Sequence, residues 1–242
     1  MATRDRSYQD FLDGFMSMAG WERVFTQDEG IINMAFNRAL RNAWEMAEWP
    51  RVCKYGEART PNGSSIVQFE ESGETTIGDV FEVWEDDPTT TANPALHPYT
   101  LVETGILMLG STIPTTAYIW YRKEVDVHKG VDHDSTLTFT QNDVRYDDTT
   151  GYFYRVTSSS VPANILITDT SYWEKLTIPH EFFEYCVHKA YAAWLRADKQ
   201  NDVAILEDRA AEEEINRALD VLQRQQDISG YTRFKTRPMP AN

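Results

Sequence analysis

The segment from Ile178 to Asp202 carries two histidines, two glutamates and a cysteine within its first eleven residues. His180, Glu184 and His188 are spaced by four, so a helix would place them on one face. A zinc hydrolase helix needs two histidines four residues apart with a glutamate beside the first. Here the histidines are eight apart, about 12 Å along a helix axis, so one metal ion cannot bind both. We interpret the row as the polar outer face of a structural helix.

A second group of possible ligands lies in the sequence EVDVHKGVDHD, residues 124–134. A loop that folded back could bring its carboxylates and imidazoles together around an ion. Such a site would use Asp126, His128, Asp132, His133 and Asp134. Their spacing matches no calcium-binding loop, and Lys129-Gly130 is typical of a turn. We therefore expect a hydrated hairpin turn here.

Nucleophiles and acid pairs give no stronger indication of an enzyme. The sequence contains no Gly-x-Ser-x-Gly, no phosphate-binding loop and no Gly-x-Gly-x-x-Gly. Cys53 follows a predicted helix end and Cys186 lies on a row of small residues, which is no catalytic setting. The pairs Asp86-Asp87 and Asp147-Asp148 could be a glycosidase pair, but both sit beside turns. We predict turn chemistry for them, no enzymatic activity, no cofactor and no metal.

Aromatic residues bracket a polar loop between residues 151 and 176. They are Tyr152, Tyr154, Tyr172 and Trp173. Aromatic rings stack on sugars, and they also fill the core of small β modules. We favour the core interpretation.

Composition and charge restrict the class of protein further. The chain has 242 residues, 41% of them hydrophobic, and a formal net charge of −15, which argues against a protein that wraps DNA. An acidic wall along which DNA slides stays possible, because it repels phosphates. No apolar run is long enough for a membrane span, and the two cysteines imply no disulfide framework. We expect assembly in the cytosol.

Apolar periodicity predicts helices at both ends of the chain. We expect them at residues 7–19, 26–49, 178–198 and about 202–226. At the start of the second, TQDE predicts a capping box between Thr26 and Glu29. Rows of small residues predict close helix packing. These rows are Ala35, Ala39 and Ala43 in the second helix, and Ala190, Ala193 and Ala197 in the third.

Between the helices, short β-rich runs are separated by turn residues. The predicted strands cover 65–69, 78–84, 101–109, 117–121, 137–140, 153–156 and 172–176. The order of segments predicts an α+β fold. Residues 1–50 and 178–226 are expected to form an antiparallel helical bundle. Residues 51–177 would form an inserted β-rich, sandwich- or barrel-like domain, and 227–242 an extended C-terminal tail.

Several segments in this order resemble the head–tail adaptor proteins of tailed bacteriophages. FNRALRNAWEMAEWP (36–50) is similar to their first long helix, and GDVFEVWEDDP (78–88) with AYIWYRKEV (117–125) to the β module of the larger members. The stretch from GYFYRV (151–156) through YWEKLTIPHEFFEY to the final helix is similar to their closing segment. The resemblance rests on the order and type of segments and covers most of the chain.

The resemblance implies a structural virion protein without catalytic residues. It would assemble in the host cytoplasm as a ring of about twelve copies, bind the portal, and receive a tail, stopper or second neck ring protein. Genomic DNA would pass through the ring without specific binding, and no membrane would be involved.

Two groups of residues are expected to act in such a ring. An acidic face of the last helix would point toward the DNA channel or a basic partner ring. It comprises Glu207, Glu212, Glu213 and Glu214. The tail interleaves aromatic and basic residues, and the resemblance implies that it docks on the portal. Its portal-binding candidates are Tyr231, Arg233, Phe234, Lys235 and Arg237.

Alternatives stay open at this point. The protein could be another phage neck or tail-completion ring, or a minor structural protein. From different classes, a carbohydrate-binding β module would use the aromatics of 151–176, and a hydrolase would use one of the acidic pairs.

Overall fold

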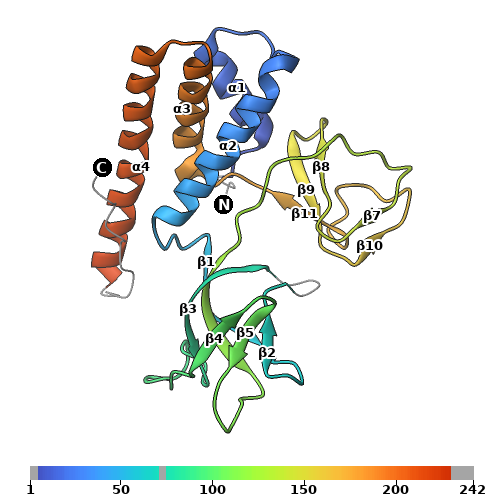
Figure 1. Ribbon diagram of the computed structural model, residues 1–242, viewed down its shortest axis with the longest axis vertical. Helices are drawn as coiled ribbons and strands as arrows, with labels where there is room; N and C mark the ends of the chain where they lie inside the picture. The colour runs from blue at the N-terminus through green and yellow to red at the C-terminus, as the bar shows by residue number, and fades with distance from the viewer. Residues whose placement is uncertain (1–4, 71–74, 230–242) are drawn as a thin grey trace. The chain divides into compact units, whose positions relative to one another are not determined.

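The computed structural model of the protein describes residues 5–70 and 75–229, with side chains through residue 225. Within these residues it is an α+β fold with four helices and several small antiparallel sheets (Figure 1). This confirms the predicted fold class at that level, and none of the described sheets closes into a barrel. The helices are α1 (Tyr8–Ala19), α2 (Thr26–Met46), α3 (His180–Ala197) and α4 (Asn201–Ser229).

The chain divides into two compact units. Unit 1 comprises Met1–Ala47 and Asp126–Asn242, and unit 2 comprises Glu48–Val125. The β-rich segment expected as one domain at 51–177 is therefore divided after Val125. Its second part belongs with the helices.

Helix starts differ from the expected pattern at α1 and α2. Ser7 caps α1 through a capping box, because its hydroxyl accepts from the Asp10 N–H while the Asp10 carboxylate accepts from the Ser7 N–H. The capping box predicted at Thr26 is wrong: Phe25 is the N-cap of α2, and no side chain caps it. Thr26 is already the first helical residue, so its hydroxyl is one position too late to act as a cap.

Helix α2 ends at Met46, three residues earlier than predicted. The backbone carbonyl of Trp49 accepts hydrogen bonds from the N–H groups of Val52 and Cys53, so the chain turns there. Trp49 is buried, which explains why apolar periodicity continues past the end of the helix. Pro179 is the N-cap of α3.

Helix α3 packs against α1, α2 and α4. The ring of Phe15 in α1 meets that of Tyr191 in α3 at 5.8 Å, and Trp44 in α2 meets Phe182 at 6.2 Å. The Trp194 indole N–H donates to the Asp28 carboxylate at 3.2 Å. Helices from the two ends of the sequence therefore share one set of contacts.

Unit 1 also contains two small antiparallel sheets, in the orders β11-β9-β8 and β10-β7. Their strands are β7 (Phe139–Thr140), β8 (Val144–Asp147), β9 (Tyr152–Val156), β10 (Ser160–Val161) and β11 (Trp173–Leu176). Buried side chains from β7, β9, β10 and β11 form one small core. Strands β8 and β10 were not predicted, because they are short and carry polar residues.

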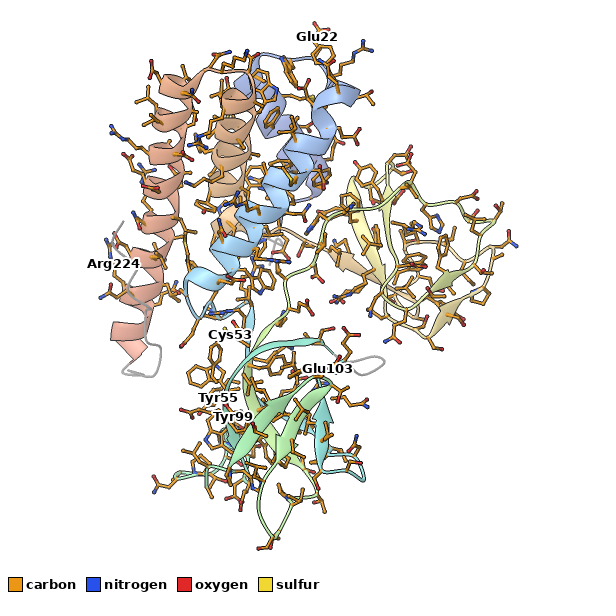
Figure 2. All side chains as sticks on the ribbon, in the orientation of Figure 1. Glu22, Cys53, Tyr55, Tyr99, Glu103 and Arg224 are labelled. Atoms are coloured by element: carbon orange, nitrogen blue, oxygen red, sulfur yellow. The ribbon has the colours of Figure 1, made fainter. Side chains whose placement is uncertain are left out.

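Unit 2 contains two three-stranded sheets, in the orders β1-β6-β3 and β2-β5-β4. Their strands are β1 (Cys53–Arg59), β2 (Ile66–Gln68), β3 (Ile77–Trp84), β4 (Tyr99–Val102), β5 (Gly105–Met108) and β6 (Ala117–Lys123). Buried residues from β2, β3, β5 and β6 form a shared core. The single strand predicted at 101–109 is a hairpin, and Glu103 lies in its turn (Figure 2).

A bulge in β1 hides this strand from sequence patterns. Its pairing with β6 shifts between Lys54 and Glu57, and Gly56 lies between them with φ 65°. A Cβ on Gly56 would come within 2.7 Å of the Pro88 side chain. The bulge interrupts the two-residue alternation that marks a strand.

The first and last strands of unit 2 are paired with each other. Cys53 pairs with Arg122, and the Lys123 N–H donates to the Val52 carbonyl at 2.8 Å. The chain therefore begins and completes unit 2 at neighbouring positions.

Candidate functional site

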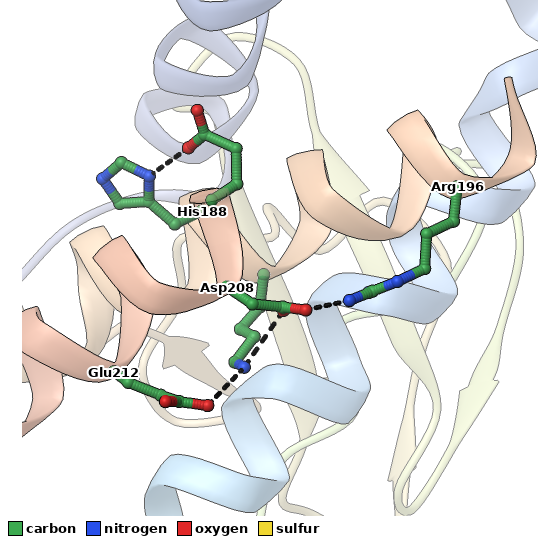
Figure 3. A network of polar contacts seen from close by, with 6 residues as sticks. His188, Arg196, Asp208 and Glu212 are labelled. Carbon is green, nitrogen blue, oxygen red and sulfur yellow. Dashed lines mark hydrogen bonds and ion pairs between the residues drawn. The ribbon is translucent and has the colours of Figure 1, made fainter. Parts of the chain in front are cut away.

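The acidic residues predicted on the last helix lie in two different environments. Glu207 is half-buried and faces α3, where its carboxylate lies 2.7 Å from Nδ1 of His188. Glu212 is more exposed, and its carboxylate lies 3.7 Å from the Lys189 ammonium. These two residues belong to a polar seam between α3 and α4 (Figure 3).

Asp208 lies at the centre of this seam. Its carboxylate accepts from Lys189 at 3.1 Å and from the Arg196 guanidinium. Burial lowers the pKa of Lys189, and the Glu212 carboxylate opposes this shift. The seam thus fixes α4 on α3 through charges that compensate one another.

Glu213 and Glu214 lie farther along α4. Both carboxylates pair with Arg217 of the same helix, Glu213 at 3.8 Å. Glu213 and Arg217 are exposed, and such pairs contribute little to stability. The expected orientation of the four glutamates toward a DNA channel stays a prediction, but Glu207 points to α3 and not to the outer side of α4.

A groove of about 320 Å³ lies between α2, α3 and α4. The predicted small-residue rows contribute Ala35, Ala39 and Ala193 to its lining, and Arg38 and Asp208 add charges. The small side chains therefore leave open space at this level. Ala43 and Ala190, one turn farther along, are fully buried.

A larger cleft of about 700 Å³ lies within unit 1. Helices α1 and α2 form one side of it, and residues 127–132 with Tyr146 and Phe153 form the other. Its lining is mixed: Leu12 and Met34 are apolar, whereas Glu29 and Asp132 carry carboxylates. The volume is in the range of protein ligand sites.

The segment 126–133, which we call the strap, is fixed onto α2 beside this cleft. Asn37 accepts from the His128 N–H at 2.8 Å and donates to the His128 carbonyl at 3.1 Å. Asn33 donates to the same carbonyl at 2.8 Å. At the start of the strap, Asp126 pairs with Arg155 of β9. Two amide side chains thus hold one backbone residue as a neighbouring strand would.

The His128 ring is buried among aromatic side chains. Its centroid lies 5.3 Å from that of Phe36, 5.8 Å from Phe153 and 6.4 Å from Tyr8. Nδ1 lies 3.3 Å from the Asp126 carbonyl, and Nε2 is buried without a hydrogen-bond partner. Burial lowers the pKa of His128 to about 4. The hydrated hairpin turn expected here is therefore wrong. The strap is hydrogen-bonded to α2 through the His128 backbone, and the His128 ring is part of the core.

The other candidate ligands are not brought together. His180 and Glu184 are exposed on α3, whereas His188 binds Glu207. His133 is half-buried beside the Phe139 ring. Across the residues whose side chains are described, no three histidine, cysteine or acidic side chains are grouped so that they could hold a metal ion.

The cysteines and acidic pairs lie in structural settings. Burial raises the pKa of the Cys186 thiol, and it raises that of Cys53 to about 11. Asp87 accepts from the N–H and hydroxyl of Thr89, and Asp147 accepts from the Thr150 hydroxyl. The predicted turn chemistry is confirmed for these two aspartates.

The aromatics of 151–176 belong mainly to a core. Tyr154 and Trp173 are buried in the small core of unit 1, and Tyr152 and Tyr172 pack against it. The Lys175 ammonium lies 4.4 Å from the centroid of the Tyr152 ring. The core interpretation is confirmed, and the rings form no exposed sugar-stacking row.

The tail candidates Tyr231, Arg233, Phe234, Lys235 and Arg237 lie outside the described residues. Conversely, Asn33 and Asn37 were not predicted as functional residues. Both sit on α2, four residues apart, where asparagine is unfavourable in a helix interior. That unusual pair was the only sequence signal for the contact between α2 and the strap.

Comparison with known proteins finds no matching family model, no matching curated protein and no matching solved structure. None of the helices in the described part of the chain is long and apolar enough to cross a membrane.

Proposed function

We propose that the protein is a structural subunit of a phage neck. In this proposal identical copies form a ring that joins the portal to a tail, stopper or second neck ring. The resemblance to head–tail adaptor proteins implies about twelve copies. It is not an enzyme and needs no cofactor. The helices from both ends of the chain act as one antiparallel bundle, and unit 2 is a sandwich-like insertion.

The observation that carries this proposal is that the outer side of α4 exposes large apolar side chains. This 29-residue helix packs on α3 through Ala204, Ala211 and Ile215. Its other side exposes large aliphatic residues, which are Val203, Ile205, Leu206 and Val221. A long helix with apolar residues on both sides is suited to a second partner. Identical ring subunits supply such a partner through a heterologous contact that closes.

The charge of the chain is consistent with a channel for DNA. Twelve copies with a net charge of −15 each would carry about −180 formal charges. Glu213, Arg217 and Asp220 are exposed on α4, so the surface of this helix is charged as well as apolar. Carboxylates that reach the lumen would repel the DNA phosphates and let the genome slide.

The ring contact is tested with a matched pair of variants. Leu206 is 61% exposed on α4, and Leu166 is 71% exposed between β10 and β11. We expect Leu206→Glu to abolish rings in electron micrographs and to reduce the mass measured by light scattering. Leu166→Glu introduces the same charge elsewhere and should leave both unchanged.

The location in the particle is tested by an averaged map of the whole virus. We expect density for this chain between the portal and the tail. A wild-type protein that stays monomeric at every concentration, or that is absent from purified particles, would contradict the proposal.

A further inference from the structure

The charged groups that act on the tyrosines of the 700 Å³ cleft are carboxylates. Burial raises the pKa of Tyr146, and Asp132, Asp148, Asp13 and Asp147 raise it further. On the opposite side, burial raises the pKa of Tyr8 to about 12 against the hydrogen bond from Asn33, with a smaller contribution from the Glu29 carboxylate. Lys129 is the cation that lines the cleft. The electric field at the cleft therefore favours a positively charged occupant.

Exposed apolar side chains surround the same cleft. Met34 of α2 is 68% exposed, and Val127 of the strap is 45% exposed. Together with Leu12 and the ring of Tyr146, they offer contacts to an apolar or aromatic group. A suitable occupant combines cations with aromatic rings.

One segment of this acidic chain has that composition. Residues 230–242, GYTRFKTRPMPAN, contain three basic residues, two aromatic residues and no aspartate or glutamate. Arg233, Lys235 and Arg237 alternate with other residues, so an extended segment would place the three cations on one side and Phe234 on the other. Thirteen extended residues span at most about 45 Å, which is far enough to reach a neighbouring molecule.

We propose that the cleft binds the C-terminal tail of a second copy of this chain. The tail follows α4, which packs on α3, whereas the cleft is formed by α1, α2, the strap and β8. Tail and cleft are different surfaces, so their contact is head-to-tail and can close a ring. This inference rests on the proposed ring and assigns one of its contacts. The resemblance implies a portal contact for the same tail residues, and the experiment below separates the two.

The contact is tested by charge exchange in the full-length chain. The cleft variant carries Glu29→Lys and Asp132→Lys, and the tail variant carries Arg233→Glu, Lys235→Glu and Arg237→Glu. We expect self-association, measured by sedimentation velocity over a dilution series, to weaken about tenfold or more in each variant. A chain that carries all five substitutions should associate again, because both surfaces have changed sign.

Mixing the two variants tests whether the tail of one copy binds the cleft of another copy. A tail variant retains its acidic cleft, and a cleft variant retains its basic tail. Each basic tail of a cleft variant should therefore bind the acidic cleft of a tail variant, and each acidic tail of a tail variant should bind the reversed cleft of a cleft variant. The mixture should associate although neither variant does so alone. If the mixture does not associate while both variants stay folded, the tail does not bind a second copy, and the proposal is wrong.

Control substitutions verify that charge change alone has no effect. Asp86→Lys and Glu103→Lys add the same charge at exposed sites of unit 2, and this protein should associate as the wild type does. The milder pair Glu29→Gln and Asp132→Asn should weaken association in the same direction, and circular dichroism confirms folding. If all cleft and tail variants associate normally, the cleft assignment fails. The ring proposal is then still decided by Leu206→Glu.

Discussion

At the residue scale, His128 couples the stability of unit 1 to pH. Its ring is buried among Tyr8, Phe36 and Phe153, and Nε2 has no partner. A protonated imidazole in this place would carry a charge without compensation. The His128 ring is therefore held neutral, although its backbone is fully hydrogen-bonded by Asn33 and Asn37.

The pKa of His128 falls from 6.5 to about 4 on folding, so the unfolded chain binds more protons between these two values. We expect the free energy of unfolding to be fully retained above pH 6.5 and to fall, by up to about 3 kcal/mol, as the pH approaches 4. His128→Phe should reduce this loss, measured by urea unfolding at several pH values. His180→Gln, at an exposed site, should keep the wild-type slope, and identical slopes in all three proteins would contradict the assignment.

Two alanines of the same row on α3 differ in the space around them. Ala190 is fully buried, whereas Ala193 is half-buried above the groove between α2, α3 and α4. We expect Ala190→Leu to lower the free energy of unfolding by about 1–3 kcal/mol through overpacking. Ala193→Leu should cost clearly less, because the leucine can extend into the groove. Equal losses in thermal melts would show that the groove does not accept a larger side chain.

At the element scale, the start of α1 is better stabilised than the start of α2. Ser7 makes both bonds of a capping box, and Thr26 makes no capping bond. We expect Ser7→Ala to destabilise unit 1 by about 1 kcal/mol and Thr26→Ala to have almost no effect. Thermal unfolding of the two variants tests this difference, and a larger loss for Thr26→Ala would contradict the observed caps.

The helices were predictable because each has a local, periodic pattern. Phe11 and Phe15 in α1, or Phe36 and Leu40 in α2, recur at helical spacing and are buried. The caps were less predictable, because Ser7 and Thr26 both stand at the start of apolar periodic segments. Ser7 is the N-cap of its helix, whereas Thr26 is already the first helical residue. Strand β1 was missed because its bulge at Gly56 removes the alternation.

The candidate sites depend on contacts that are distant in sequence. Asn37 and His128 are separated by 91 residues, and nothing local to either indicates the other. Glu207 appears in the sequence as part of an acidic face, but its partner His188 lies on the preceding helix. The negative field of the cleft arises from α1, α2, the strap and β8 together, so the sequence alone could not reveal it.

At the scale of the whole molecule, unit 2 has the organisation of an insertion. Its first strand pairs with its last, and Lys123 bonds back to Val52. It has its own core, and the buried Arg59 guanidinium donates to the Thr75 carbonyl and the Tyr121 hydroxyl within the unit. These interactions do not require unit 1.

We therefore expect residues 48–125 to fold when expressed alone. The isolated segment should unfold cooperatively in urea and show dispersed amide signals in NMR spectra, because its core and its end-to-end pairing are internal. Arg59→Met serves as a control, since it removes the hydrogen bonds to Thr75 and Tyr121 and should lower the midpoint. A segment that is unfolded without residues 1–47 would show that unit 2 is not autonomous.

The contacts between the first and last helical segments of unit 1 also determine how the chain bears mechanical load. Arg6 and Ile178 exchange two backbone hydrogen bonds, and α1 packs on α3, so both ends of the sequence are joined directly within unit 1. Tension applied to the two termini crosses these contacts and bypasses the inserted segment. Unit 2 is loaded only after they rupture. A chain built in this way can carry tension between its two ends while its inserted unit stays relaxed.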